Sequence, residues 1–89
     1  MPRIVFTPSL QRHVTTPVET VPGATVAAAL QAYFARHPRV RSYVLDEQGE
    51  LRRHVVVFVD GEQIRDRSRQ LDALSEEAEI FVMQALSGG

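Results

Sequence analysis

Apolar and polar residues follow two kinds of pattern along this chain, and the first kind predicts β-strands. Short runs rich in β-branched residues at 4–7 and 17–21 predict two strands that pair as a hairpin with a long connection. The longest apolar run, residues 54–59, predicts a central strand that is buried on much of both faces. The Asp-Gly pair at 60–61 then predicts a tight turn, and residues 62–65 predict a short returning strand.

The last strand is predicted at residues 80–86, directly before the Gly-Gly end. Successive side chains of a strand point to opposite faces, so Ile80 and Val82 share one face while Phe81 and Met83 share the other. If the first pair faces a helix, the second pair either forms an exposed interaction patch or is covered by another part of the chain. The pattern alone leaves these two alternatives open.

The second pattern has the 3.6-residue period of an amphipathic helix and spans residues 25–37. Thr25 can cap the start of this helix, and Pro38 disfavours a helical conformation in the residue before it. The apolar face consists of Val26, Leu30, Tyr33, Phe34 and His37.

Residues 39–53 are predicted to be a connecting segment rather than a second helix. Its apolar residues are expected to cover one edge of the core; they are Val40, Tyr43, Val44 and Leu45. This segment is also the part of the chain that would cover Phe81 and Met83 if those side chains are not exposed.

The predicted order of elements is strand, strand, helix, strand, short strand, strand, which defines an α+β domain. We expect a mixed sheet of four to five strands packed on one main helix. Because 89 residues leave room for only one hydrophobic core, residues 1–86 are predicted to form the domain and residues 87–89 a flexible Gly-Gly tail. A last strand in the middle of the sheet would hold the start of that tail firmly.

Composition narrows the possible classes of function. The net charge of −1 does not suggest a nucleic-acid-binding domain, which is usually markedly basic. Cysteine is absent, so the chain has no disulfide framework, thiolate metal site or nucleophilic thiol. All ten basic residues are arginine, so no lysine is present to form an isopeptide chain. No apolar run suits a secretory signal or a membrane span, so we expect a cytoplasmic protein with no membrane partner, monomeric when alone.

Gly88 and Gly89 are the first candidate functional residues. Without Cβ atoms, they can pass through a channel too narrow for a side chain. The carboxylate of Gly89 is anionic at neutral pH and could be the substrate of another enzyme. Taken alone, two terminal glycines are more often a frayed end than a functional one.

The remaining polar residues form no recognisable catalytic constellation. His13, His37 and His54 lie far apart without metal-ligand spacing, so no metal site is predicted. Two charged clusters are expected to be solvated, although either could meet a partner of opposite charge. They are Arg65, Arg67 and Arg69, and Glu76, Glu77 and Glu79.

Taken in order, several short segments resemble the MoaD/ThiS family of small sulfur carriers, which share the ubiquitin-like β-grasp fold. The resemblance covers nearly all 89 residues and rests on VPGATV at 21–26, RHP at 36–38, LRRHV at 51–55, FVDGEQIR at 58–65 and SGG at 87–89. The segment YVLDEQGEL at 43–51 is similar to the branch that includes the cysteine-pathway carrier CysO. Two turns depart from the family pattern. Members often have Asp-Gly-Asp where this chain has Glu77-Ala78-Glu79, and Gly where it has Gln70.

The resemblance implies that this protein is not itself an enzyme and binds no cofactor stably. A MoeB/ThiF-like adenylyltransferase would use ATP and Mg²⁺ to adenylate the carboxylate of Gly89. A sulfur donor would then replace AMP, and the resulting thiocarboxylate would pass its sulfur to an acceptor enzyme in a biosynthetic pathway.

The resemblance also implies roles for single residues near the end of the chain. Gly88 would extend with the terminal residue into the cleft of the partner, Leu86 and Ser87 would guide the neck, and Phe81 and Met83 would anchor the body. Three alternatives remain open: a small subunit of a molybdopterin-synthase-like complex, a ubiquitin-like protein modifier, and a plain β-grasp interaction module.

Overall fold

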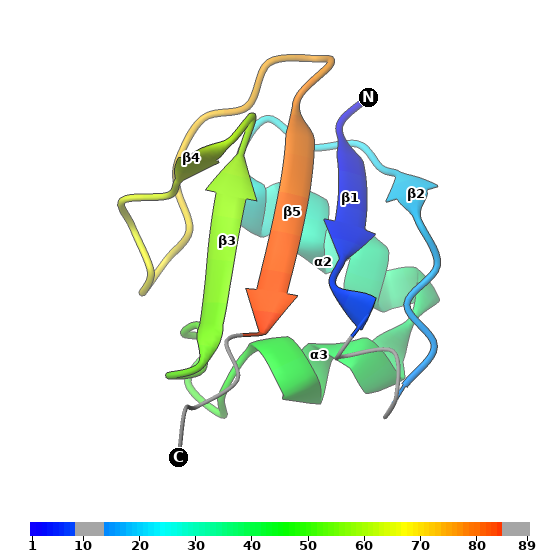
Figure 1. Cartoon of the computed structure of the whole chain (residues 1–89), viewed down its shortest axis with the longest axis vertical. Helices are drawn as coiled ribbons and strands as arrows, with labels where there is room; N and C mark the ends of the chain where they lie inside the picture. Colours follow the sequence, from blue (N-terminus) through cyan, green and yellow to red (C-terminus); the bar gives the residue numbers. More distant parts are fainter. Residues whose placement is uncertain (9–13, 85–89) are drawn as a thin grey trace.

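A computed structural model describes residues 1–8 and 14–84, which form a sheet with a helix across one face (Figure 1). The strands are β1 (Arg3–Phe6), β2 (Glu19–Thr20), β3 (Val55–Val59), β4 (Glu62–Gln63) and β5 (Glu79–Gln84). The helices are α2 (Val26–Arg36) and α3 (Pro38–Val44). The five strands lie in the order β2-β1-β5-β3-β4. This mixed sheet packed on one main helix is the predicted α+β, β-grasp arrangement.

The last strand, β5, is the centre of the sheet. It pairs in parallel with β1, from Arg3 opposite Glu79 to Phe6 opposite Val82, and antiparallel with β3 on its other side. The predicted hairpin of the first two strands is also confirmed, since β1 and β2 pair antiparallel. Its second strand and the returning strand β4 are each only two residues long, shorter than predicted.

The run at residues 54–59 forms an interior strand of the sheet, as predicted, but the prediction that both of its faces are largely buried was wrong. These residues form β3, which lies between β5 and the edge strand β4. Val55 and Val57 are buried, while Val56 and Phe58 on the other face are only half-buried. The run is almost continuously apolar because one face packs on the core and the other belongs to an apolar surface described below.

Helix α2 has the predicted bounds to within one residue at each end. The Thr25 side-chain oxygen accepts a hydrogen bond from the Ala28 amide at 3.2 Å, which satisfies one of the free donors at the helix start. One face of the helix packs against the sheet and is buried through Val26, Ala29, Leu30, Tyr33 and Phe34. Across the interface, Ile4, Val57 and Ile80 are fully buried.

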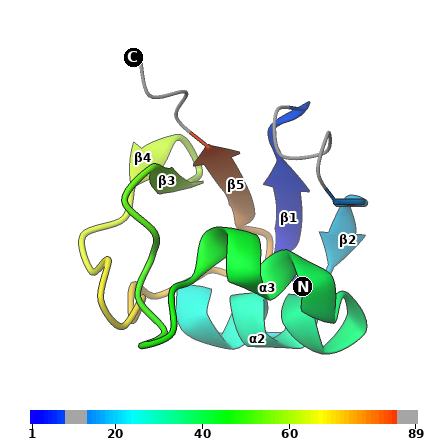
Figure 2. The same cartoon turned by 90° about the horizontal axis from the view of Figure 1, so that it is seen from below.

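The prediction that residues 39–53 contain no helix was also wrong. Pro38 ends α2 and at the same time begins α3, because proline is well suited to the first position of a helix. Val40 and Val44 lie one turn apart and are both buried, so they fasten α3 to the core. Leu45 is buried as predicted, whereas Tyr43 is 36% exposed. Figure 2 shows α3 across the end of the sheet at which β5 finishes.

Gln70 has φ +53°, a conformation for which glycine is the ordinary residue. Its buried side chain compensates for this strain, because its amide donates to the carbonyl oxygens of Arg67 at 2.7 Å and Gly49 at 3.4 Å. The departure from the family pattern at this turn therefore ties two loops together. The predicted tight turn at 60–61 is also present, with φ of +50° at Asp60 and +87° at Gly61.

Gly23 lies where the chain passes close to the backbone of α2. A Cβ atom added there would be 2.6 Å from the Ala29 amide nitrogen and 2.9 Å from its Cα, both backbone atoms that cannot rotate away. We expect Gly23→Ala to lower the free energy of unfolding by about 1–3 kcal/mol more than Gly49→Ala does. Gly49 is the matched control, since it also has a positive φ, +82°, but nothing lies within 4 Å of its added Cβ. Urea unfolding of the two variants makes the comparison, and equal losses would contradict the close approach.

Candidate functional site

The predicted site residues Leu86, Ser87, Gly88 and Gly89 lie outside the described residues, so the structure shows only the root from which they follow. That root is Gln84, the last residue of β5. The Gln84 amide donates to the side-chain oxygen of Thr7 at 3.3 Å, and the Thr7 amide donates to the Val82 carbonyl oxygen at 3.1 Å. On the other side, Gln84 lies opposite Val55 of β3. The strand is therefore flanked on both sides up to its last described residue.

Phe81 and Met83 lie on the face of the sheet that points away from α2. Ile80 and Val82, on the helix face, are 0% and 1% exposed, so the predicted alternation is confirmed. Phe81 and Met83 are half-buried. Figure 1 views the sheet from this side, and residues 39–53 lie beyond the end of the sheet rather than over it. Of the two alternatives, cover by residues 39–53 is therefore excluded.

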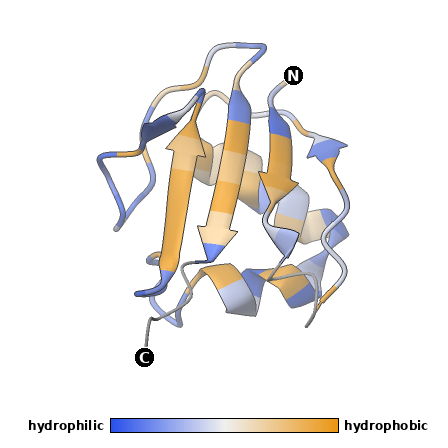
Figure 3. Ribbon diagram, viewed as in Figure 1, coloured by the Kyte–Doolittle hydropathy of each residue, from blue (hydrophilic) through white to orange (hydrophobic). Residues whose placement is uncertain are grey.

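Three further apolar residues share this face, and together the five side chains form what we call the open-face patch. The strand register places Phe81 between Val5 and Phe58, and Met83 beside Val56. All five are half-buried, and Figure 3 shows that β1, β5 and β3 are apolar along most of their length, as expected for strands with apolar side chains on both faces. The sequence pattern does not indicate Val5, Val56 and Phe58 as members of this surface, because only the register of the three strands brings them next to the predicted pair.

Polar side chains border the open-face patch. At the start of β5, Arg3 and Glu79 form an exposed ion pair at 3.7 Å. Gln63 of β4 lies beside Phe58 at the other margin. An apolar area with a polar border is typical of a protein interaction surface.

His37 has a structural position at the end of α2. Its imidazole contacts the carboxylate of Glu19 in β2, and Arg36 pairs with the same carboxylate at 2.8 Å. Both contacts tie the edge strand β2 to the helix. His54 is exposed directly before β3, and His13 lies outside the described residues.

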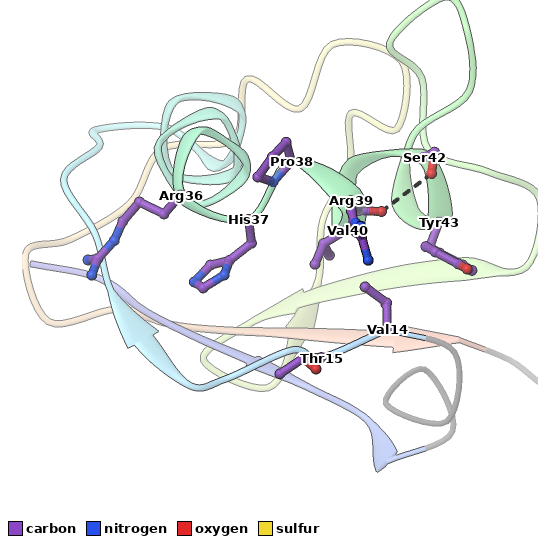
Figure 4. Close-up of a pocket in the computed structure, with 9 residues that line it drawn as sticks. All are labelled: Val14, Thr15, Arg36, His37, Pro38, Arg39, Val40, Ser42 and Tyr43. Carbon is purple, nitrogen blue, oxygen red and sulfur yellow. Dashed lines mark hydrogen bonds between the residues drawn. The ribbon is translucent and has the colours of Figure 1, made fainter.

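A pocket of about 650 Å³ lies between the α2–α3 corner and residues 14–15 (Figure 4). Arg36 and His37 on its wall are already paired with Glu19, and the Ser42 hydroxyl donates to the Arg39 carbonyl oxygen at 3.4 Å. These lining residues offer no pair of a nucleophile with an adjacent base. Within residues 1–8 and 14–84, no three His, Cys, Asp or Glu side chains are grouped to hold a metal ion.

The two predicted charged clusters do not converge on a site. Arg67 donates to the Arg52 carbonyl oxygen at 2.9 Å, while the amides of Arg65 and Arg69 are held by the carboxylates of Asp72 and Asp66. The amides of Arg65 and Asp66 together lower the pKa of the Asp72 carboxyl group. The arginine cluster therefore belongs to an ordered loop. The three glutamates are exposed at the start of β5.

The arrangement of the sheet and its helix defines a ubiquitin-like β-grasp protein. The sequence model of the ThiS family matches residues 11–89, and the chain belongs to this family. Among curated proteins, no sequence matches the chain. In the part of the chain that the structure describes, neither helix is long and apolar enough to cross a membrane.

Several solved structures share the fold along their whole length. SAMP1 from Haloferax volcanii is 27% identical, with a TM-score of 0.79 over 99% of this chain and 98% of that one. A chain in the crystal structure of the Amycolatopsis orientalis BexX/CysO complex is 20% identical, with a TM-score of 0.83 over 100% of both chains. Mycobacterium tuberculosis CysO is 18% identical, with a TM-score of 0.80 over 97% of this chain and 100% of that one. The last two comparisons show the shared fold alone.

Tyr33 makes the stability of the fold around β2 depend on pH, and this dependence can be measured. Its ring is fully buried, and its hydroxyl donates to the Pro17 carbonyl oxygen at 2.7 Å. Burial, and then the negative charge of Glu19, raise the pKa of Tyr33 to about 12. The folded state thus favours the neutral phenol, and this contribution to stability is complete below the unfolded pKa of about 10 and is lost as the pH rises to about 12.

We therefore expect absorbance at 295 nm to show one tyrosine of the folded protein ionising only near pH 12. Tyr33→Phe should lack this late step, and its stability should fall less between pH 10 and 12 than that of the wild type. A late step that persists in Tyr33→Phe would contradict the assignment.

Proposed function

We propose that this protein is a sulfur carrier whose C-terminal carboxylate is adenylated by a MoeB/ThiF-like enzyme and converted to a thiocarboxylate. The observation that carries the proposal is the match to the ThiS family, which extends to residue 89. The structure adds support, because the tail follows the central strand and starts from a firmly paired residue.

The chemistry requires activation of the carboxylate by ATP. A carboxylate is a poor acylating group, because its leaving group would be an oxide ion. Attack of the Gly89 carboxylate on the α-phosphorus of ATP releases pyrophosphate and forms an acyl-adenylate. Hydrosulfide then attacks the acyl carbon, AMP leaves, and one proton is released. The thiocarboxylate differs from the starting carboxylate by sulfur in place of one oxygen.

The tail has a limited reach, which constrains the partner. Five residues follow Gln84, and an extended chain spans at most about 3.5 Å per residue, so the carboxylate reaches roughly 17 Å from the root. Leu86 and Ser87 would form the neck, and the two glycines would pass the narrowest part of the partner's channel. Because this reach is short, the body of the carrier must dock close to the channel entrance.

The open-face patch is the surface that suits this docking. Phe81 and Met83 belong to the strand that leads into the tail, so a partner that covers the patch also lies beside the tail root. The aromatic and Met side chains of the patch are enriched in the centres of protein interfaces. The crystal structure of the Amycolatopsis orientalis BexX/CysO complex contains a chain of this fold, which is consistent with a protein partner.

Conversion to the thiocarboxylate is directly measurable. Incubation with ATP, Mg²⁺, sulfide and the activating enzyme encoded nearest to this gene should raise the mass of the intact chain by about 16 Da. A chain that lacks Gly88 and Gly89 is the matched control and should gain no mass. An unchanged mass of the complete chain would count against the proposal.

The docking role of the patch is tested by adding a charge to it. Met83→Glu should raise the KM of the carrier in the adenylation reaction at least tenfold with little change in kcat, because docking would bury an unpaired carboxylate. Gln31→Glu adds the same charge on the exposed side of α2 and should leave KM unchanged. Urea unfolding checks that both variants are folded, and equal KM values would exclude the patch as the docking surface.

A second candidate function is supported by the likeness to SAMP1, a small archaeal modifier protein that is 27% identical to this chain. If the protein is a modifier, its activated carboxylate would form amide bonds with lysine amines of other proteins. Since this chain has no lysine, each attachment would be a single copy with no lysine-linked chains. Recovery of Gly-Gly remnants on lysines of cellular proteins would favour this function over sulfur transfer.

A further inference from the structure

We propose that Thr7 is a positioning residue for the tail, because its hydroxyl group holds the Gln84 amide, the last described amide before the tail. The inference rests on the proposed function, since it concerns how the carboxylate is presented to the activating enzyme. Its basis is the hydrogen bond between the Thr7 side-chain oxygen and the Gln84 amide.

This hydrogen bond replaces a backbone contact of the parallel ladder. Beyond the last paired residues, Phe6 and Val82, the Thr7 amide still donates to the Val82 carbonyl oxygen at 3.1 Å. In a regular parallel ladder, the same residue would accept the next amide of β5 on its own backbone carbonyl. Here the hydroxyl oxygen accepts that amide, at 3.3 Å. The side chain therefore completes the ladder at the position where β1 ends.

Strand β3 offers no substitute for this contact. Amides along a strand alternate in direction, so the Gln84 amide, which points to β1, cannot also bond to β3. The last described amide before the tail is thus held by one side chain.

Loss of the Thr7 hydroxyl group would affect the position of the tail root more than the packing of the domain. The part-buried Gln84 amide would lose its acceptor, and β5 could separate from β1 at its last residue. The last hydrogen bond between β5 and the β1 side would then be the one at Val82, so the position of Gln84 would be less defined. Met83, the neighbouring residue, belongs to the open-face patch, so the distance between docking surface and carboxylate would also be less defined.

Thr7→Val and Thr7→Ser form the matched pair of variants, because valine keeps the shape of threonine without the hydroxyl and serine keeps the hydroxyl. With the full chain and its activating enzyme, Thr7→Val should raise the KM for adenylation roughly two- to tenfold with kcat unchanged. Thr7→Ser should restore most of the wild-type KM. If Thr7→Val is adenylated with the same KM as the wild type, the positioning role of Thr7 is overturned. The proposed function would then still stand.

Amide hydrogen exchange tests the same contact without a partner. In Thr7→Val, exchange at Gln84 should rise several-fold while the amides of Ile80 and Val82 keep their protection. A uniform rise along β1 and β5 would show a merely structural role and overturn the inference. A wild-type chain that is never adenylated would overturn the proposed function instead. Unchanged exchange at Gln84 would overturn the inference whatever the outcome with the enzyme.

Discussion

The pairing of β5 on both of its sides is the constraint on which the structure depends. Phe81 and Val82 each have a partner in β1 and another in β3, so the strand cannot shift its register with one neighbour alone. A shift by one residue would turn Ile80 and Val82 out of the core and place the surface residues inside it. The hydrophobic core therefore fixes the position and direction of β5 up to Gln84, its last described residue.

The same alternation gives the sheet two different faces. Side chains toward α2 form the core, while those on the other side form an apolar surface that no described element covers. The strands at both edges, β2 and β4, are only two residues long, which leaves little exposed backbone for pairing with other chains. Contacts with other proteins are therefore favoured through the open-face patch over the edge strands of the sheet. β2 is further held by Glu19, whose carboxylate contacts the end of α2.

The sequence predicted those helices and strands whose first and last residues are determined by residues next to them in the chain. Helix α2 has its cap at Thr25 and its end before Pro38, so its bounds could be predicted from sequence alone. Helix α3 was missed because Pro38 was interpreted only as a stop, although proline also suits a helix start. The apolar run in β3 indicated burial of two faces, since sequence does not distinguish a buried face from an apolar surface. The contact between Thr7 and Gln84 joins residues 77 positions apart, and no local pattern could indicate it.

The parallel alignment of β1 and β5 also separates the two ends of the described chain. Both strands run in the same direction, so the residues before Arg3 lie at the opposite end of the sheet from Gln84 (Figure 1). A fluorophore, affinity tag or surface linker attached before Arg3 would thus lie on the far side of the body from Gln84. Protein immobilised in this way should present the end of β5 outward, which leaves the surface around Gln84 accessible to other proteins in solution.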